Sequence, residues 1–414
     1  MTSLEKISRN NPFFKHGYTA AMSSIFQMPR TVWLVGIISF INDSASEMLY
    51  PLIPLYLASV LMAGPKAMGL IEGIADATSS LLKLASGVLV DKTKRIKPWL
   101  FFGYGLAGLS RPLVAFAGSW VTVLFIRFAD RVGKGLRSSP RDALLADSVA
   151  SHQRGMAYGL HRAMDNGGAV LGPIIAYGLL SMHVPIKDIF LLAIIPATLC
   201  LILVLCVKEP KRIPVESTPL RWKLSEMPTS LKRFLVVVAI FSLGNSSNIF
   251  LLFRAKELGI PEAYIPLLWA VVSLIAALFS TPLASLSDRV GRFPILLGGY
   301  FAFAVVYVSL GLFDEGLIAL ALTFGLYGIF VAATEGVEKA MVADLAPDDK
   351  RGTAFGWFNM TVGIFLLPSS VIFGELYEGA SPSVAFAFSA ACAALACILL
   401  WHWFKPGRTA QVGS

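Results

Sequence analysis

The chain has 414 residues, of which 56% are hydrophobic and only 15% are charged. Soluble domains carry about 25% charged residues, so the composition excludes an ordinary soluble fold and indicates helices in a lipid bilayer. The net charge of +9 could suit nucleic acid, but the basic residues lie between apolar runs, and we therefore expect no nucleic-acid partner.

Twelve mainly apolar runs are long enough to span a bilayer, which takes about 20 residues. They cover 31–60, 67–90, 98–118, 120–141, 155–180, 187–207, 233–254, 263–286, 294–313, 316–338, 352–375 and 383–404. Charges weaken the hydropathy of the fourth, fifth and tenth runs, which are kept because an even number agrees with the loop charges. The predicted fold class is an all-α membrane protein with twelve transmembrane helices.

The charges of the connecting segments alternate along the chain. Lysines and arginines follow the second, fourth, sixth, eighth, tenth and twelfth runs, whereas Asp314, Glu315, Glu375 and Glu378 occupy the other loops. Cytoplasmic loops carry the excess of basic residues. The pattern therefore predicts a multi-pass protein of the cytoplasmic (inner) membrane, with the segment 1–30 and the tail 405–414 both in the cytoplasm.

The stretch 208–232 contains four prolines and no apolar run, and it divides the chain into a bundle at 31–207 and another at 233–404. Three separate segments repeat at one constant offset of 197 residues. They pair 87–95 with 284–292, Asp147 with Asp344, and Arg154 with Arg351. A constant offset predicts two parallel six-helix repeats joined by a cytoplasmic linker.

The repeated loop motif resembles that of the major facilitator superfamily of transporters, G-x-L-x-D-[RK]-x-G-[RK]-[RK]. The matching residues of the two copies are Gly87, Leu89, Asp91, Lys92 and Arg95, then Leu286, Asp288, Arg289, Gly291 and Arg292. Lys94 and Ala284 replace glycines of the motif. The resemblance implies a monomer that works by alternating access and a gating role for Gly87, Asp91, Lys92, Arg95, Asp288, Arg289 and Arg292.

The physics of the first copy is consistent with a gate. Asp91 ends the second run, and we expect it to accept hydrogen bonds from the start of the eleventh helix near Gly352, where the helix dipole favours an anion.

The fifth run carries Gly159, Gly168, Gly172 and Pro173. This spacing is similar to the motif of antiporters in the same family, although Ala176 and Tyr177 stand where that motif ends in two glycines. The likeness is closest to bacterial proton-coupled drug or metabolite efflux members. Bare glycine faces let a neighbouring helix approach closely. The alternative interpretation is that these glycines serve generic helix packing and not a specific antiport motif.

Ionisable residues concentrate in the first bundle at one depth of the membrane. Such groups are costly in lipid, so each is a functional hypothesis. We predict a proton-coupling network of Asp43, Glu47, Asp76, Arg127, Asp130, Arg131 and Asp165. Its carboxylates would alternate between pairing with arginine and binding a proton. The alternative is a static ion-pair lattice that fixes helix packing. Lys134, Arg137, Arg141 and Asp142 are expected at the cytoplasmic interface, where long side chains reach water.

The second bundle has fewer ionisable groups and more amide and aromatic ones, which suits an amphipathic organic molecule. The predicted substrate contacts of both halves are Asn42, Arg111, Asn166, Asn245, Asn248, Trp269, Tyr327, Glu335 and Asn359. Glu338 is expected to form an interfacial ion pair with Lys339. The asymmetry predicts proton coupling in the first half and much of the substrate contact in the second. Bending is expected at Pro51 and Pro54 in the first helix, and at Gly363 and Pro368 in the eleventh.

The leading functional hypothesis is export of a small organic molecule by proton antiport. The alternative is uptake by proton symport of an anionic metabolite, held by Arg111, Arg127 and Arg131. A non-transporting scaffold or receptor is a third hypothesis. The sequence contains no HExxH, GxSxG or GxxxxGK[ST] motif, so we expect neither an enzyme nor an ATP-driven pump. The histidines and cysteines have no ligand spacing, and no metal or cofactor is predicted.

Overall fold

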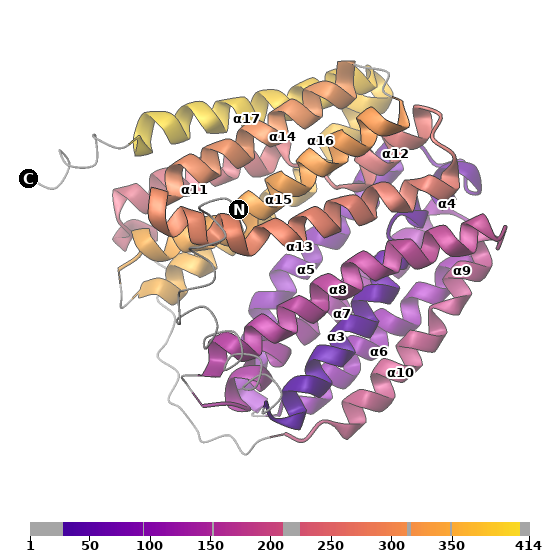
Figure 1. Ribbon diagram of the computed structural model, residues 1–414, viewed down its shortest axis with the longest axis horizontal. Helices are drawn as coiled ribbons and strands as arrows, with labels where there is room; N and C mark the ends of the chain where they lie inside the picture. Colours follow the sequence, from indigo (N-terminus) through magenta and orange to yellow (C-terminus); the bar gives the residue numbers. More distant parts are fainter. Residues whose placement is uncertain are drawn as a thin grey trace, which may run out of the picture.

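The computed structural model describes residues 28–93, 95–150, 153–209, 224–312, 316–347 and 350–405, with backbone alone at 84, 85 and 87–93. All regular structure in this part of the chain is helical. Figure 1 shows two bundles side by side, the first in indigo to magenta and the second in orange to yellow.

The first bundle contains six spans. They are α3 (Arg30–Leu49) with α4 (Leu52–Ser59), α5 (Pro65–Thr93), α6 (Lys97–Leu113) with the short η1 (Val114–Phe116), α7 (Trp120–Asp147), α8 (Arg154–Ser181), and α9 (Ile186–Leu192) with α10 (Ile194–Cys206). The element η3 (Leu224–Glu226) precedes the second bundle.

The second bundle also contains six spans. They are α11 (Thr229–Gly244) with α12 (Ile249–Glu257), then η4 (Glu262–Tyr264) with α13 (Ile265–Val290), α14 (Arg292–Leu312), α15 (Leu317–Leu345), α16 (Arg351–Gly379) and α17 (Pro382–Phe404). The predicted fold of twelve helices in two repeats is thereby confirmed. The first helix of this bundle begins at Thr229 rather than at the predicted 233.

Eight of the twelve spans in the described chain are long and apolar enough to cross a membrane. The other four are α5 to α8, which together carry about as many charged residues as the remaining eight spans. The prediction that the tenth span is weakly hydrophobic was wrong, because α15 reaches a mean hydropathy of 2.1 over its best window. Its two glutamates lie toward one end and leave the rest of the helix apolar.

The first and seventh spans are interrupted at corresponding places. A break at Tyr50 and Pro51 separates α3 from α4, as expected at a proline. Residues 245–248 separate α11 from α12. In this non-helical segment, the backbone amide of Ser247 finds a hydrogen-bond partner outside its own span, since it donates to Ser370 Oγ of α16 at 3.2 Å. The eleventh span, in contrast, is one continuous helix through Pro368.

The two bundles meet where α5 packs on α16 and α8 packs on α13 (Figure 1). We call the end of the molecule where α10 ends and α11 begins the linker end, and the opposite end, near α4 and α12, the far end. Polar contacts close the far end. Ser59 donates to Glu262 at 2.8 Å, and the Lys66 ammonium lies 3.1 Å from Glu375.

Two glycines of α8 allow α3 to approach closely, as predicted. A Cβ on Gly168 would lie 2.5 Å from the Phe40 carbonyl oxygen, and one on Gly172 would lie 2.4 Å from the Ser44 carbonyl oxygen. The same prediction for Gly159 was wrong, because a Cβ there meets nothing within 4 Å. The motif therefore packs helices only in its second half.

Replacing Gly172 by alanine is expected to destabilise the protein. The new methyl group would press against the backbone of α3, and overpacking of this kind costs about 1–3 kcal/mol. The thermal midpoint of purified protein, followed by fluorescence-detected size-exclusion chromatography, measures the loss. Gly159→Ala is the matched control and should leave the midpoint unchanged or slightly raised. Equal midpoints for the two variants would contradict the packing role of Gly172.

Candidate functional site

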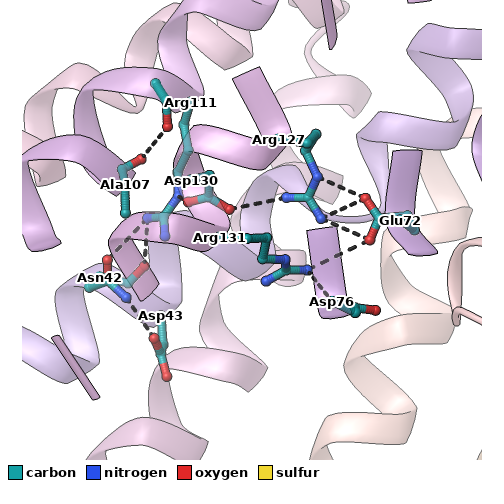
Figure 2. Close-up of polar contacts among 10 residues, drawn as sticks. Asn42, Asp43, Glu72, Asp76, Ala107, Arg111, Arg127, Asp130 and Arg131 are labelled. Carbon is teal, nitrogen blue, oxygen red and sulfur yellow. Dashed lines mark hydrogen bonds and ion pairs between the residues drawn. The ribbon is translucent and has the colours of Figure 1, made fainter. Parts of the chain in front are cut away.

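A chain of ion pairs crosses the interior of the first bundle (Figure 2). Glu72 of α5 is fully buried, and its carboxylate accepts hydrogen bonds from Arg127 Nε at 2.8 Å and Nη2 at 2.9 Å. Such two-pronged pairing suits the planar guanidinium and fixes its orientation. Arg127 lies on α7, so this contact joins the second span to the fourth.

Asp130 extends the network toward the first and third spans. It accepts from Arg127 Nη1 at 3.3 Å and from Arg111 Nε at 2.9 Å. Arg111 also donates to the Asn42 side chain at 3.1 Å, and Asn42 donates in turn to Asp43 at 2.7 Å. The network therefore joins α3, α5, α6 and α7 (Figure 2).

Arg131 forms the margin of the network nearest the second bundle. It pairs with Glu72 at 3.6 Å and with Asp76 at 3.5 Å. The Asp76 side chain is 31% exposed, whereas that of Glu72 is fully buried. The Arg131 Nε has no hydrogen-bond partner among the described residues. The ion pairs are therefore shorter and more fully hydrogen-bonded at the centre of the network than at Arg131.

In the ion-paired part of the network, Arg111, Arg127 and Arg131 face the three carboxylates of Glu72, Asp76 and Asp130, and this pairing is what makes their burial tolerable. A small cavity beside Arg111, Arg127 and Asp130 has a volume of about 10 Å³, enough for about one water molecule. Asn42 and Arg111, predicted as substrate contacts, are buried in this network. Glu72 was absent from the predicted set, although its four-residue spacing from Asp76 was a usable signal.

A second polar cluster lies where α3 meets α8. Ser39 Oγ and His161 Nε2 lie 2.8 Å apart, and the same nitrogen lies 3.7 Å from Asp165 Oδ1. No predicted site included Ser39 or His161. Nearby, Glu47 of α3 accepts a hydrogen bond at 2.8 Å from Trp269 Nε1 of α13. This contact links the two bundles directly.

A substrate-sized space lined by both bundles lies toward the linker end. A cavity of about 530 Å³ is bounded by α5 and α7 on one side and by α15 and α16 on the other. Its lining is Ser80, Lys83, Ser139, Asp142, Glu335, Glu338, Lys339, Phe355, Phe358, Asn359 and Val362. Of the predicted substrate contacts, Glu335 and Asn359 line it.

The remaining predicted contacts lie elsewhere. Tyr327 donates to Asn248 beside the break between α11 and α12, near Asn245. Asn166 faces a separate apolar crevice of about 460 Å³ between α8 and α13. The structure does not bring these residues to the cavity, and their role as substrate contacts stays a prediction.

Two expectations about charged residues were wrong. Glu338 forms no ion pair with Lys339 in the described chain and instead accepts a hydrogen bond from buried Tyr300 at 2.9 Å. Arg137 does not reach water but is 4% exposed, with its guanidinium 4.5 Å from the centre of the Tyr104 ring. A cation over an aromatic face offers a buried arginine an alternative to a carboxylate.

The gating motif is described only in part. Gly87, Asp91 and Lys92 are described by their backbone alone, so the expected contact of the Asp91 side chain with α16 stays a prediction. In the second copy, Arg292 pairs with Asp288 and donates to Asp344 at 3.0 Å. By the repeat offset, Arg95 and Asp147 hold the equivalent positions in the first copy. Arg289 and Arg95 are both exposed.

Comparison with known proteins agrees with this architecture. The sequence matches the profile of the Major Facilitator Superfamily over residues 35–237 and again over 234–414. The chain belongs to the Major Facilitator Superfamily. An uncharacterised MFS-type transporter of Methanocaldococcus jannaschii is 33% identical over 381 residues, which cover 90% of this chain and 95% of the relative.

Another relative is the multidrug resistance protein MdtG of Escherichia fergusonii, 26% identical over 402 residues, with 90% of this chain and 94% of MdtG covered. Among solved structures, a mutant of the nucleoside transporter NupG superposes with a TM-score of 0.78 at 12% identity, covering 91% of this chain and all of NupG. The human organic anion transporter MFSD10 gives 0.65 at 18% identity, covering 90% of this chain and all of MFSD10. The two structures share the fold.

Replacing Glu72 by glutamine is expected to lower the free energy of unfolding by about 3–5 kcal/mol, because it leaves two buried arginines short of a carboxylate. Thermal melting of the purified protein measures the loss. Glu375→Gln removes an exposed partner of Lys66 and should cost at most about 1 kcal/mol. Similar losses in both variants would show that the buried network does not hold the bundle together.

Proposed function

We propose that this transporter exports a small organic molecule across the cytoplasmic membrane in exchange for protons. The observation that carries the proposal is the cavity of about 530 Å³ lined by both bundles toward the linker end, together with the polar contacts that close the far end. A site between two rigid halves, accessible from one side at a time, is the requirement of alternating access. The volume suits a drug-sized ligand.

The excess of basic residues in the loops supports placing the linker end in the cytoplasm. With that orientation the cavity faces the cytoplasm, which is the state in which an exporter loads its substrate. The relationship to MdtG, a protein named for multidrug resistance, supports the direction.

Proton coupling is assigned to the half-buried acids at the margin of the ionic network. Asp76 is the partly exposed partner of Arg131, whereas Glu72 and Asp130 are enclosed. A proton arriving at the exposed part of the Asp76 carboxylate would neutralise it and release Arg131 from it. Asp43, Glu47 and Asp165 lie at similar partly buried positions and complete the proposed proton-binding set.

The symport alternative depended on arginines that are free to bind an anionic substrate. Arg111, Arg127 and Arg131 are each held by carboxylates of the same bundle. An anionic substrate would have to displace a buried acid from them, at a large electrostatic cost.

Everted membrane vesicles provide a test of antiport in which the substrate need not be identified beforehand. Respiration acidifies the vesicle lumen and quenches acridine orange. An exported compound added outside should enter in exchange for protons and restore the fluorescence. A panel of amphipathic drugs and aromatic metabolites is the probe set, and vesicles without the transporter give the background. Fluorescence recovery with no member of the panel, in vesicles that contain folded protein, contradicts proton antiport.

Asp76→Asn is expected to weaken the proton-driven response by at least about tenfold while leaving substrate exchange at equilibrium, because the variant retains the cavity but lacks a titrating group at the margin. Counterflow in proteoliposomes measures the exchange. Asp188→Asn changes an exposed acid of α9 at the far end and should leave both activities intact. Unchanged proton-driven transport in Asp76→Asn would remove this carboxylate from the coupling mechanism.

A further inference from the structure

The charged groups around the cavity between the bundles are unequally partnered. Its lining contains three acids and two lysines. Glu335 is paired with Arg162 of α8, and Glu338 accepts a hydrogen bond from the Tyr300 hydroxyl. Asp142 lies 3.1 Å from the neighbouring Arg141 guanidinium. Each acid therefore already has a donor supplied by the protein.

The two lysines have no such partner. In the described part of the chain neither the Lys83 nor the Lys339 ammonium forms an ion pair or a hydrogen bond. Lys83 comes from α5 of the first bundle and Lys339 from α15 of the second, and both line the same cavity. Lys339 repels Lys83 across it, while the acids Asp142 and Glu335 of the same lining attract Lys83 without forming an ion pair with it. Two like charges held around a partly desolvated space are stabilised by an anion between them.

The rest of the lining favours an aromatic or apolar body next to that anionic group. Phe355 and Phe358 of α16 face the cavity together with Val362, and Asn359 lies among them. Aromatic walls with a few placed polar groups are typical of sites for amphipathic organic ligands. The amide of Asn359 adds both donor and acceptor capacity.

We propose that Lys83 and Lys339 form a two-lysine anion site and that the transported molecule is an amphipathic organic anion whose apolar body packs on Phe355 and Phe358. This assignment names the substrate class of the site in the proposed function and rests on that function. It also gives the two bundles one shared ligand, because each contributes one cation. A bridging anion would therefore bind the cytoplasm-facing and outward-facing states differently, which is what transport requires.

The electrostatic part of the proposal can be tested while the substrate is unidentified. In a variant whose four native cysteines are replaced, Asn359→Cys places a thiol in the cavity. Its reaction with anionic 2-sulfonatoethyl methanethiosulfonate is compared with that of cationic 2-(trimethylammonium)ethyl methanethiosulfonate. The lysines should favour the anionic reagent by about tenfold or more relative to a free thiol. Val362→Cys provides a second probe position if the first variant folds poorly.

Substitution of the lysines is the decisive comparison. Lys83→Gln and Lys339→Gln should each lower the anionic preference several-fold, and the double variant should abolish it. Lys66→Gln is the matched control, because Lys66 lies at the far end and pairs with Glu375. A preference for the cationic reagent, or an anionic preference that survives the double substitution, overturns the site.

Ligand protection then tests the substrate class. 2-Naphthoate, 2-naphthylmethylamine and 2-naphthylmethanol share one aromatic body and differ in charge. Only the carboxylate should slow the modification of the introduced thiol, and the double lysine variant should lose that protection. Protection by the amine or the alcohol alone, or by none of the three, contradicts the assignment.

These readouts are independent of proton coupling. If the anion preference and the protection hold while vesicles show no proton exchange, the proposed antiport fails and the two-lysine site stands. If vesicles exchange protons for cationic drugs and the thiol prefers the cationic reagent, the antiport stands and the anion site fails.

Discussion

The first bundle depends on one constraint, which is that a charge placed in lipid must be compensated within the protein. Glu72 meets this constraint for two arginines at once, and Asp130 meets it for Arg127 and Arg111. Helices in a bilayer gain little from hydrophobic burial against each other, because lipid tails are equally apolar. The ionic network supplies the specificity that the hydrophobic effect does not, and it fixes four spans in rotation and depth.

The second bundle obtains the same rigidity from ring packing. Phe241 stacks on Tyr300 with ring centres 3.9 Å apart, and Phe303 stacks on Tyr307 at 4.0 Å. Close-packed aromatic interiors deform little. Because each bundle is rigid in itself, a conformational change is expected at the interface between the two bundles. Polar contacts that cross this interface include Glu47 with Trp269 and Arg162 with Glu335.

The sequence predicted the helical spans well and the direction of the side chains poorly. Hydropathy and the constant repeat offset were enough to predict the twelve spans and the two repeats. Which way a side chain points depends on helix rotation and tilt, and these are set by contacts between distant segments. Glu72 and Asp76 share one face of α5, yet the small difference in their positions makes one fully buried and the other 31% exposed. The pairing of Glu338 with Tyr300 and of Arg137 with Tyr104 was hidden for the same reason.

The gradient of burial across the network reconciles the two interpretations of its charges. Glu72 and Asp130 are enclosed by arginines and almost fully buried, so they fit a static lattice. Asp76 shares Arg131 with Glu72 but is partly exposed, so a proton can reach it without opening the bundle. In the proposed mechanism, neutralising Asp76 leaves Arg131 with an excess of positive charge at the edge that faces the second bundle. Relief of that charge requires either a new anionic partner or a change at the interface. The rigid interior of the network is then required for coupling. If the whole network could rearrange, it would compensate for the neutralised Asp76 within the first bundle, and the second bundle would not be affected.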